Sequence, residues 1–366
     1  MKSAEKLFII QTANMTGGGS QSIRGLIHNL NESVDLLVNT DSRVNNGALK
    51  RFYGKNVRKI YRYHLPFRRS ALGLKHKKNG AKEWAVRERD YLRDKKKIYD
   101  LIRLNKYRFI HLNSYVLYPL LTSHFPMYIH IREVFDGNFL TRKIVYDKLR
   151  QAKGIIYIDY AVQESFGVCN KKEIVLNNPF NQSSVLDVNP EEVQNRLGLQ
   201  CNKTIISFVL ARPDKVKGLD YVVNEFLHSG CNESELLIAG IEAPDEYRNL
   251  SNVHFLGRVE KMYEIYAISD FVVRGDPMFA VGRTIYEALY SGCHVIIPGV
   301  EHSDKKKVFE YDRFMRQITF YEPRAKNALS KAIRRMDGKK KEKCLGLSNE
   351  KEYIEQFYQF IGGAEL

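Results

Sequence analysis

Two segments in the second half of the chain carry the residues best suited to chemistry. In the first, Arg212 follows an apolar stretch and Lys217 stands at the expected start of a helix. A cation after a strand and a second cation at a helix N-terminus form a receptor for a diphosphate, because the free N–H groups of the helix end also attract anions. Basic residues are common in loops, so this spacing by itself also fits an ordinary solvated loop.

The second segment is DPMFAVGRTIYEALYSGCHVIIPG, residues 276–299. Gly282 permits a close approach of the backbone, and Thr284 is a good helix start. Glu287 follows one turn later, where its carboxylate can accept hydrogen bonds from sugar hydroxyls. The simpler interpretation is that Glu287 caps the helix N-terminus, and the local pattern alone favours this capping.

Short apolar runs alternate with amphipathic stretches and indicate the elements that position these residues. This alternation predicts α/β architecture with largely parallel sheets and helices on both faces. A polar, turn-rich stretch near 180–195 predicts a boundary, giving an N-terminal domain over 1–185, a C-terminal domain over 186–348 and a final helix over 349–366. The expected strands are 6–10, 34–40, 107–113, 126–131, 154–159, 204–210, 235–240, 252–257, 270–275 and 294–299, and the expected helices include 21–30, 219–228, 261–269 and 284–291.

Composition narrows the class of protein. The chain has 366 residues, 44% of them hydrophobic, which excludes collagen-like and wholly disordered proteins and suggests two domains. The five cysteines are odd in number and form no CxxC, so we expect reduced thiols and no metal or disulfide framework. No apolar run suits a membrane span, and the apolar stretch 7–10 is too short for a signal peptide. We therefore expect a cytoplasmic protein.

The basic charge is concentrated in one segment, Lys50–Arg108. This segment has 21 Lys or Arg against 5 Asp or Glu, and accounts for the whole net charge of +16. It fits the α/β pattern badly until about residue 82, where a helix with a charged face is expected. Cations interleaved with aromatic residues suit an anionic membrane interface or single-stranded nucleic acid, whereas a solvated loop and helix face is the plain alternative.

The order of these motifs resembles the C-terminal domain of retaining GT-B glycosyltransferases of the family-4 type, glycosyl transferases group 1. The resemblance is carried by R-x4-K-G at 212–218, LLIAG at 236–240, VHFLGRV at 253–259 and GRTIYEALYSGCHVI at 282–296. It implies that Arg212 and Lys217 hold the donor diphosphate and that Glu287 holds the nucleotide ribose. The backbone N–H groups of 282–284, which include Arg283, would face the diphosphate.

One position departs from the pattern of this family. The family has a Glu eight residues before the position of Glu287, where it contacts donor sugar hydroxyls, and here that position is Phe279. Asp276 is a nearby substitute, or the donor is recognised differently. Because of this departure, the identity of the sugar stays open. A second hypothesis also stays open, namely that the protein binds a nucleotide but has no transfer activity.

The N-terminal half resembles the family more weakly. In MTGGGSQSIRGLIHNL, residues 15–30, Gly18 and Gly19 match a glycine-rich turn that lets the backbone approach the donor, although an ordinary strand-to-helix turn has the same pattern. Arg132 occupies the strand end where the family commonly has a His, and His130 precedes it on the same strand face. Arg132 suits neutralisation of the leaving diphosphate or a buried ion pair. Asn178 replaces the Gly of an interdomain N-G motif.

The resemblance implies a GT-B fold, two Rossmann-like domains facing a cleft, with the C-terminal helix packed back on the first domain. It implies retaining transfer of a sugar from a nucleoside-diphosphate sugar, with UDP as the commoner nucleotide, to a glycan or lipid-linked acceptor of bacterial surface polysaccharide synthesis. Cations and helix-end amides stabilise the leaving diphosphate, so we expect no metal and no other cofactor. The expected location is peripheral, on the inner face of the cytoplasmic membrane. The competing hypothesis is a basic nucleic-acid-binding protein, although no standard signature for one appears.

Overall fold

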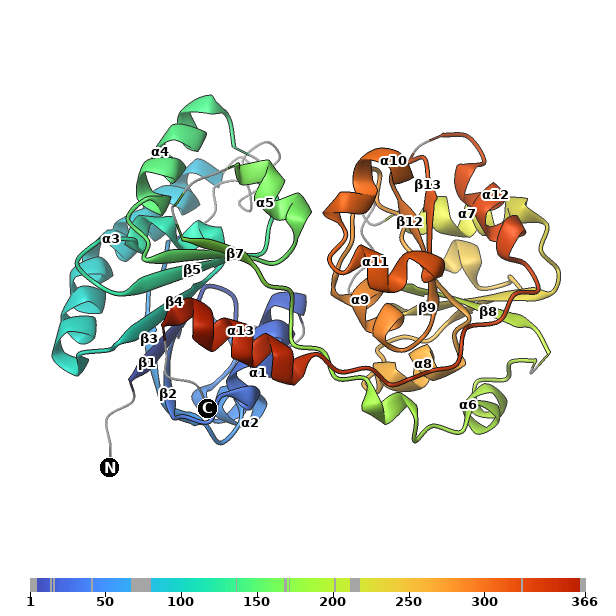
Figure 1. The fold of residues 1–366 in the computed structure, drawn as a ribbon, viewed down its shortest axis with the longest axis horizontal. Helices are drawn as coiled ribbons and strands as arrows, with labels where there is room; N and C mark the ends of the chain where they lie inside the picture. The colour runs from blue at the N-terminus through green and yellow to red at the C-terminus, as the bar shows by residue number, and fades with distance from the viewer. Residues whose placement is uncertain are drawn as a thin grey trace. The chain divides into compact units, whose positions relative to one another are not determined.

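The computed structural model forms two compact units (Figure 1). The first is Met1–Pro179 together with Lys351–Leu366, and the second is Phe180–Glu350. The expected boundaries at 185/186 and 348/349 lie a few residues from these divisions. The structure describes residues 5–13, 15, 17–40, 42–66, 80–135, 137–167, 170, 172–200, 202–210, 218–323 and 325–362.

The first unit is built on a parallel sheet of seven strands in the order β3-β2-β1-β4-β5-β6-β7. Five of these strands, β1, β2, β4, β5 and β6, are buried along their whole length, as continuous apolar runs in a parallel sheet require. The strands are β1 (Lys6–Ile10), β2 (Val34–Asn39), β3 (Val57–Tyr63), β4 (Phe109–Asn113), β5 (Met127–Ile131), β6 (Gly154–Tyr157) and β7 (Glu173–Val175).

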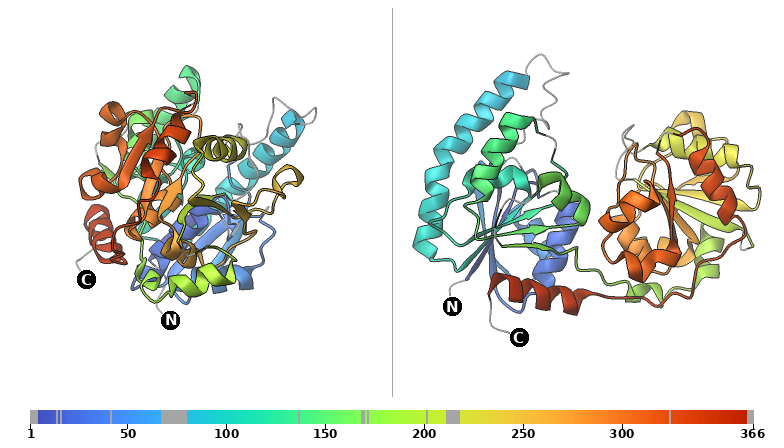
Figure 2. Two further views of the ribbon diagram at one scale, coloured as in Figure 1. Left: turned by 90° about the vertical axis from the view of Figure 1, so that its right-hand side faces the viewer. Right: turned by 45° about the horizontal axis from the view of Figure 1, so that its top comes forward.

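Helices cover both faces of this sheet (Figures 1 and 2). One face packs against α3 (Gly80–Asn105), the 3-10 helix η2 (Tyr115–Leu120), α4 (Phe139–Leu149) and α5 (Tyr160–Phe166). The other face packs against α1 (Gly18–Asn29), α2 (Asn46–Tyr53) and the C-terminal helix α13 (Glu350–Ile361). The ring of Phe357 in α13 meets that of Phe109 at 5.6 Å, and the hydroxyl of Tyr128 donates to the carbonyl of Ile361 at 3.1 Å. The end of the chain is therefore part of the first unit.

The basic segment contains one element that the sequence analysis missed. Residues 57–63 form β3, the edge strand of the sheet, where we expected no α/β element. An edge strand tolerates the cations that obscured its pattern, because one side of it faces solvent. The expected helix from residue 82 is confirmed as α3, and residues 67–79 lie outside the described residues.

The second unit is a parallel sheet of six strands in the order β10-β9-β8-β11-β12-β13. Its strands are β8 (Thr204–Val209), β9 (Ser234–Ala239), β10 (Val253–Phe255), β11 (Phe271–Val273), β12 (His294–Pro298) and β13 (Ile318–Tyr321). Helices α7 (Leu219–Ser229) and α12 (Ala328–Met336) pack on one face. The other face carries α8 (Met262–Ile268), α9 (Arg283–Tyr290) and α11 (Tyr311–Phe314); further helices are η3 (Ser183–Val185), α6 (Pro190–Arg196), η5 (Asp245–Tyr247), α10 (Glu301–Asp304), η6 (Lys305–Lys307) and η7 (Met315–Gln317).

Both sheets start with the same topology. In each unit the first strand lies between the second and the fourth strand, which is the order of a doubly wound α/β fold. The predicted α/β class is therefore confirmed. In such folds ligands bind outside the carboxyl ends of the strands, at the point where the strand order reverses. That point lies between β1 and β4 in the first unit and between β8 and β11 in the second.

Candidate functional site

In the second unit, the loops that follow β8 and β11 carry the predicted donor-binding residues. The loop after β8 contains Arg212 and Lys217, which lie outside the described residues. The next residue, Gly218, is described. It has a φ of 73°, and a Cβ on it would lie 2.1 Å from the carbonyl oxygen of Gly275. Only glycine fits there, and its backbone brings the end of the β8 loop against the loop that follows β11.

Glu287 of α9 is partly buried and is held by two side chains. Its Oε1 accepts from the Arg283 guanidinium at 2.6 Å, and its Oε2 accepts from the Tyr266 hydroxyl at 2.9 Å. Burial, and then the neighbouring carboxylate, raise the pKa of Tyr266 well above its usual value, so the hydroxyl stays a neutral donor. These contacts fix the direction of the Glu287 side chain.

The capping interpretation of Glu287 is wrong. The N-cap of α9 is Gly282, which has extended backbone and no side-chain cap. Glu287 is the fifth helical residue and contacts Arg283 one turn earlier instead of the N-terminal N–H groups. Because Gly282 has no side chain, the N-cap residue of α9 gives no side-chain cap to the helix.

Arg274 was not among the predicted residues, yet it organises the loop between β11 and α9. Its Nη2 pairs with Asp276 Oδ2 at 2.7 Å, and both side chains are largely buried. A Cβ on Gly282 would lie 3.1 Å from the Nη1 of Arg274, so the glycine makes room for the guanidinium. The Nε of Arg274 is buried without a hydrogen-bond partner among the described residues. Its position directly after a buried strand was the one available sequence signal.

Phe279 packs into the second unit instead of presenting a polar group. It lies against the cluster formed by α9, β12 and their neighbours, and the ammonium of Lys307 lies 5.7 Å from the centre of its ring. Asp276, the substitute considered for the missing Glu, is the partner of Arg274. The side chain at position 279 thus has an apolar role in this chain.

The predicted residues of the first unit meet at the strand ends of β4 and β5. Arg132 donates through Nε to Asn113 Oδ1 at 2.5 Å, through Nη1 to Asn178 Oδ1 at 2.8 Å and through Nη2 to His130 Nδ1 at 3.2 Å. Sequence reasoning missed Asn113 as a partner of Arg132, because three separate segments supply this cluster. We call Arg132 with Asn113 and Asn178 the arginine clamp.

Two buried histidines lie beside the arginine clamp. His130 and His111 are both fully buried, and His111 Nε2 lies 3.4 Å from His130 Nδ1. Burial, followed by the charge of Arg132, lowers the pKa of both imidazoles well below the usual value. Both rings are therefore neutral at physiological pH. His130 has no exposed surface of its own, and its neighbour toward the strand end is the half-buried Arg132.

Two further features border this edge of the first unit. Ser114, with a φ of 122°, follows β4 and donates to Glu133 Oε1 at 2.7 Å. Gly18 and Gly19 begin α1 after β1, and a Cβ on either would meet nothing within 4 Å. The space beside these two glycines is open, so a larger side chain at either position would not clash with the described residues.

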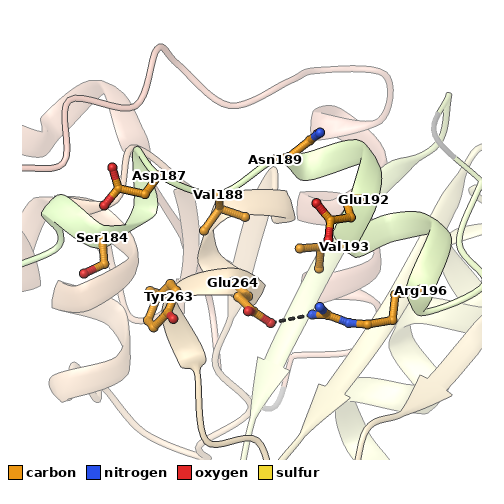
Figure 3. A pocket seen from close by; sticks show the side chains of 9 residues that line it. All are labelled: Ser184, Asp187, Val188, Asn189, Glu192, Val193, Arg196, Tyr263 and Glu264. Carbon is orange, nitrogen blue, oxygen red and sulfur yellow. Dashed lines mark hydrogen bonds and ion pairs between the residues drawn. The ribbon is translucent and has the colours of Figure 1, made fainter.

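The second unit also has a pocket of about 260 Å³ between η3, α6 and α8 (Figure 3). None of the predicted residues lines it. Its walls include Asp187, Glu192 and Glu264, and Glu264 pairs with Arg196. An acidic lining disfavours a diphosphate. Among the described residues, no group of His, Cys, Asp and Glu is arranged to hold a metal ion.

The fold and these strand-end clusters define the class of protein: two doubly wound α/β units of GT-B type, each with polar groups at the carboxyl ends of its central strands. Residues 203–336 match the model of the family Glycosyl transferases group 1. The matched segment contains the predicted donor motifs. No curated protein matches the chain.

Several solved structures share the fold over nearly the whole chain. Anabaena Alr3699/HepE, in complex with UDP and glucose, is 14% identical with a TM-score of 0.64 and covers 91% of this chain and 89% of its own. Sucrose-phosphate synthase from Thermosynechococcus elongatus is 15% identical, with a TM-score of 0.66. The match covers 97% of this chain and 96% of the synthase. WaaG, a glycosyltransferase involved in lipopolysaccharide biosynthesis, is 14% identical with a TM-score of 0.61, over 90% of each chain. The predicted GT-B fold is confirmed.

Proposed function

We propose that the protein is a retaining glycosyltransferase that moves a hexose from a UDP-sugar to a hydroxyl of a glycan or lipid-linked acceptor. One observation carries the proposal. The strand–loop–helix unit from Arg274 to Glu287 holds a clamped carboxylate and a helix N-terminus with a glycine N-cap at the point where strand order reverses, within the segment that matches the family model.

The residues of the second unit bind the donor nucleotide in this proposal. Arg212 and Lys217 stabilise the charge that develops on the leaving diphosphate, and the N–H groups of Arg283 and Thr284 donate to its oxygens. Glu287 accepts from the ribose hydroxyls. Binding of UDP by Anabaena Alr3699/HepE, which has the same fold, supports this choice of nucleotide.

Arg132 is the proposed catalytic residue of the first unit. The arginine clamp holds the guanidinium through neutral amide oxygens, which orient it without cancelling its charge. Arg132 then supports the leaving diphosphate. His130 is fully buried, so it acts as a positioning residue that accepts from Arg132, and not as a group in contact with the sugar. Gly18 and Gly19 leave open surface for the approach of a substrate.

We propose that the reaction needs no metal ion or other cofactor. The cations and helix-end amides named above supply the positive charge that a metal would otherwise provide. The leaving phosphate accepts the proton of the acceptor hydroxyl, as the family resemblance implies. Full activity after treatment with EDTA supports this proposal, and activity restored only by a divalent cation contradicts it.

The proposed acceptor belongs to bacterial surface polysaccharide synthesis at the inner face of the cytoplasmic membrane. WaaG acts in lipopolysaccharide biosynthesis and WaaB is a lipopolysaccharide outer core galactosyltransferase, and both have the same fold. The basic segment Lys50–Arg108 would bind anionic lipids, each cation adding about 1 kcal/mol near such a surface. No helix of the described residues is long and apolar enough to cross a membrane.

A thermal-shift panel tests the donor proposal. UDP, GDP, ADP, CMP and dTDP are compared on the wild-type chain and on the Lys217→Ala variant, because a ligand of the native state raises the melting temperature. We expect UDP to stabilise the wild type and not the variant. If no nucleoside diphosphate does so while short RNA or DNA does, the proposed function is wrong and the basic segment binds nucleic acid.

A further inference from the structure

Helix α4 of the first unit exposes a row of large apolar side chains. Phe139 is 78% exposed, Leu140 69% and Ile144 57%. At 3.6 residues per turn these three positions span about 140° of the helix circumference, so they share one broad face. We call these three residues the α4 ridge. Scattered exposed leucines are ordinary, but three large apolar side chains on one helix face mark an interaction surface.

The ridge is held outward by the way α4 is anchored. Asn138 caps the helix by accepting from the Thr141 N–H at 2.9 Å, which fixes the start of the helix at Phe139. Val145 and Leu149 are buried in the core of the first unit, on the opposite side. The helix therefore has apolar residues both toward the core and toward the outside. The inward pair accounts for folding, and the outward row does not.

Basic residues outnumber acidic ones around the ridge. Lys143 is exposed on the same face, one turn after Phe139, whereas the exposed Arg150 pairs with Asp147, the one acidic residue of α4, at 3.2 Å. Helix α3 lies beside α4 (Figures 1 and 2), and burial followed by the charge of Lys148 lowers the pKa of Lys95 on α3. Apolar side chains among Lys and Arg are typical of helices that lie in an anionic lipid interface.

The ridge also lies close to the arginine clamp along the chain. Arg132 ends β5, and Phe139 begins α4 only a short loop later. Because the amino end of α4 follows the carboxyl end of β5, the ridge begins at the edge of the sheet that carries Arg132. A surface bound to the ridge would thus present its head groups on the side of the first unit that carries Arg132.

We propose that the α4 ridge inserts into the interface of an anionic bilayer, with the cations of α3 and α4 on lipid head groups. The apolar contact of the protein with the membrane then lies outside the basic segment Lys50–Arg108, on a helix that charge alone does not single out. This inference deepens the proposed function, because it rests on a membrane-bound acceptor.

Flotation of the full chain with vesicles tests the proposal. Vesicles of phosphatidylcholine alone are compared with vesicles rich in phosphatidylglycerol. We expect Leu140→Ser/Ile144→Ser to reduce binding to the anionic vesicles by at least about tenfold, since two apolar side chains that would enter the bilayer are lost. The control is Leu345→Ser, which removes a side chain that is 61% exposed in the second unit. Equal loss in the control, or no loss in the ridge variant, overturns the proposal.

A site-specific probe separates insertion from simple charge attraction. Trp84 is the only tryptophan of the chain, so Trp84→Phe gives a background without tryptophan. In that background we expect the emission of Phe139→Trp to shift to shorter wavelength with anionic vesicles and to be quenched by brominated lipids. Leu345→Trp should show neither effect. Flotation without any change in the Phe139→Trp emission would mean that another surface binds lipid.

Two further readouts make the failures distinguishable. The UDP thermal shift of the ridge variant reports donor binding, so an intact shift with lost flotation supports the ridge alone. A wild-type chain that floats but never responds to a nucleoside diphosphate contradicts the proposed function and leaves the ridge supported. Sedimentation of the wild-type and ridge-variant chains without lipid covers the remaining outcome. If the wild type is a dimer and the variant a monomer, while flotation is unchanged, the ridge contacts a second copy of the chain and the proposal is overturned.

Discussion

Both units carry a polar cluster at the carboxyl ends of their strands, but they assemble these clusters differently. In the second unit, Arg274, Asp276, Arg283 and Glu287 come from one strand–loop–helix segment, and each arginine pairs with a carboxylate. In the first unit, the arginine clamp joins three separate segments, and amide oxygens hold the guanidinium. A carboxylate offsets the charge of its arginine, whereas an amide only orients it. In our proposal the second cluster holds the nucleotide and the first supports the leaving diphosphate, so the two clusters should respond differently to substitution.

The strongest test of this difference is Arg132→Ala. If the first unit supplies charge in the transition state, kcat falls about 10²–10³-fold, as for the loss of an oxyanion donor, while UDP affinity stays unchanged. Steady-state release of UDP and calorimetric UDP binding measure the two quantities. Arg150→Ala, an exposed arginine on the same unit, should alter neither. A matching loss of UDP affinity in Arg132→Ala would erase the distinction between the units.

Glu287→Ala tests the binding role of the second unit. We expect UDP affinity to fall about 10–100-fold, the range for a hydrogen bond to a charged group. The melting temperature should fall too, because the buried Tyr266 hydroxyl loses its acceptor. Glu287→Gln retains an oxygen for Tyr266, so it should recover the melting temperature but not the affinity. Normal UDP binding by the Gln variant would show that Glu287 is structural only.

The buried histidines give the first unit a pH dependence. His111 and His130 have lowered pKa values in the folded state, so the unfolded chain binds protons first as pH falls. The two neutral imidazoles contribute fully to the free energy of unfolding above the unfolded-state pKa of about 6.5. Below that pH the free energy of unfolding falls by about 1.4 kcal/mol per histidine for each pH unit, until the folded-state pKa is reached.

Denaturant unfolding between pH 7.5 and 5.5, about one unit on either side of the unfolded histidine pKa, measures this loss. The His111→Gln/His130→Gln variant should have a flatter profile over that range. Hydrogen exchange in β4 and β5 assigns the change to the first unit. A loss of protection confined to the strands of the second unit would refute the assignment.

Asn178→Gly is the mildest change and sharpens the account of the arginine clamp. It removes one neutral acceptor from Arg132, and we expect kcat to fall about 3–10-fold with an unchanged KM for the donor. The Arg132→Ala/Asn178→Gly double variant should be no worse than Arg132→Ala alone, because the two residues act through one contact. Additive losses would mean that Asn178 has a separate role.

The predictability of the two clusters follows from how far apart their residues lie along the chain. Gly282 and Glu287 are neighbours on one loop and helix, so their spacing indicated the second cluster. Asn113 and Asn178 lie on strand ends far from each other in sequence, and nothing local linked Asn113 to Arg132. The prediction that Glu287 caps its helix was wrong because several contacts are compatible with its position near the helix start. In the fold its carboxylate instead accepts from Arg283 and Tyr266.

The sequence by itself determined the α/β class, the repeated strand pattern, the segment that holds the donor motifs and the concentration of basic charge. These are local properties, because hydrophobic periodicity and short motifs need only neighbouring residues. The tertiary structure decided which distant groups meet: Arg132 with Asn113 and Asn178, the Tyr266 hydroxyl with Glu287, and the outward direction of the α4 ridge. Parallel strands bring together the ends of segments that are far apart in the chain, and only the pairing of those strands fixes which side chains become neighbours.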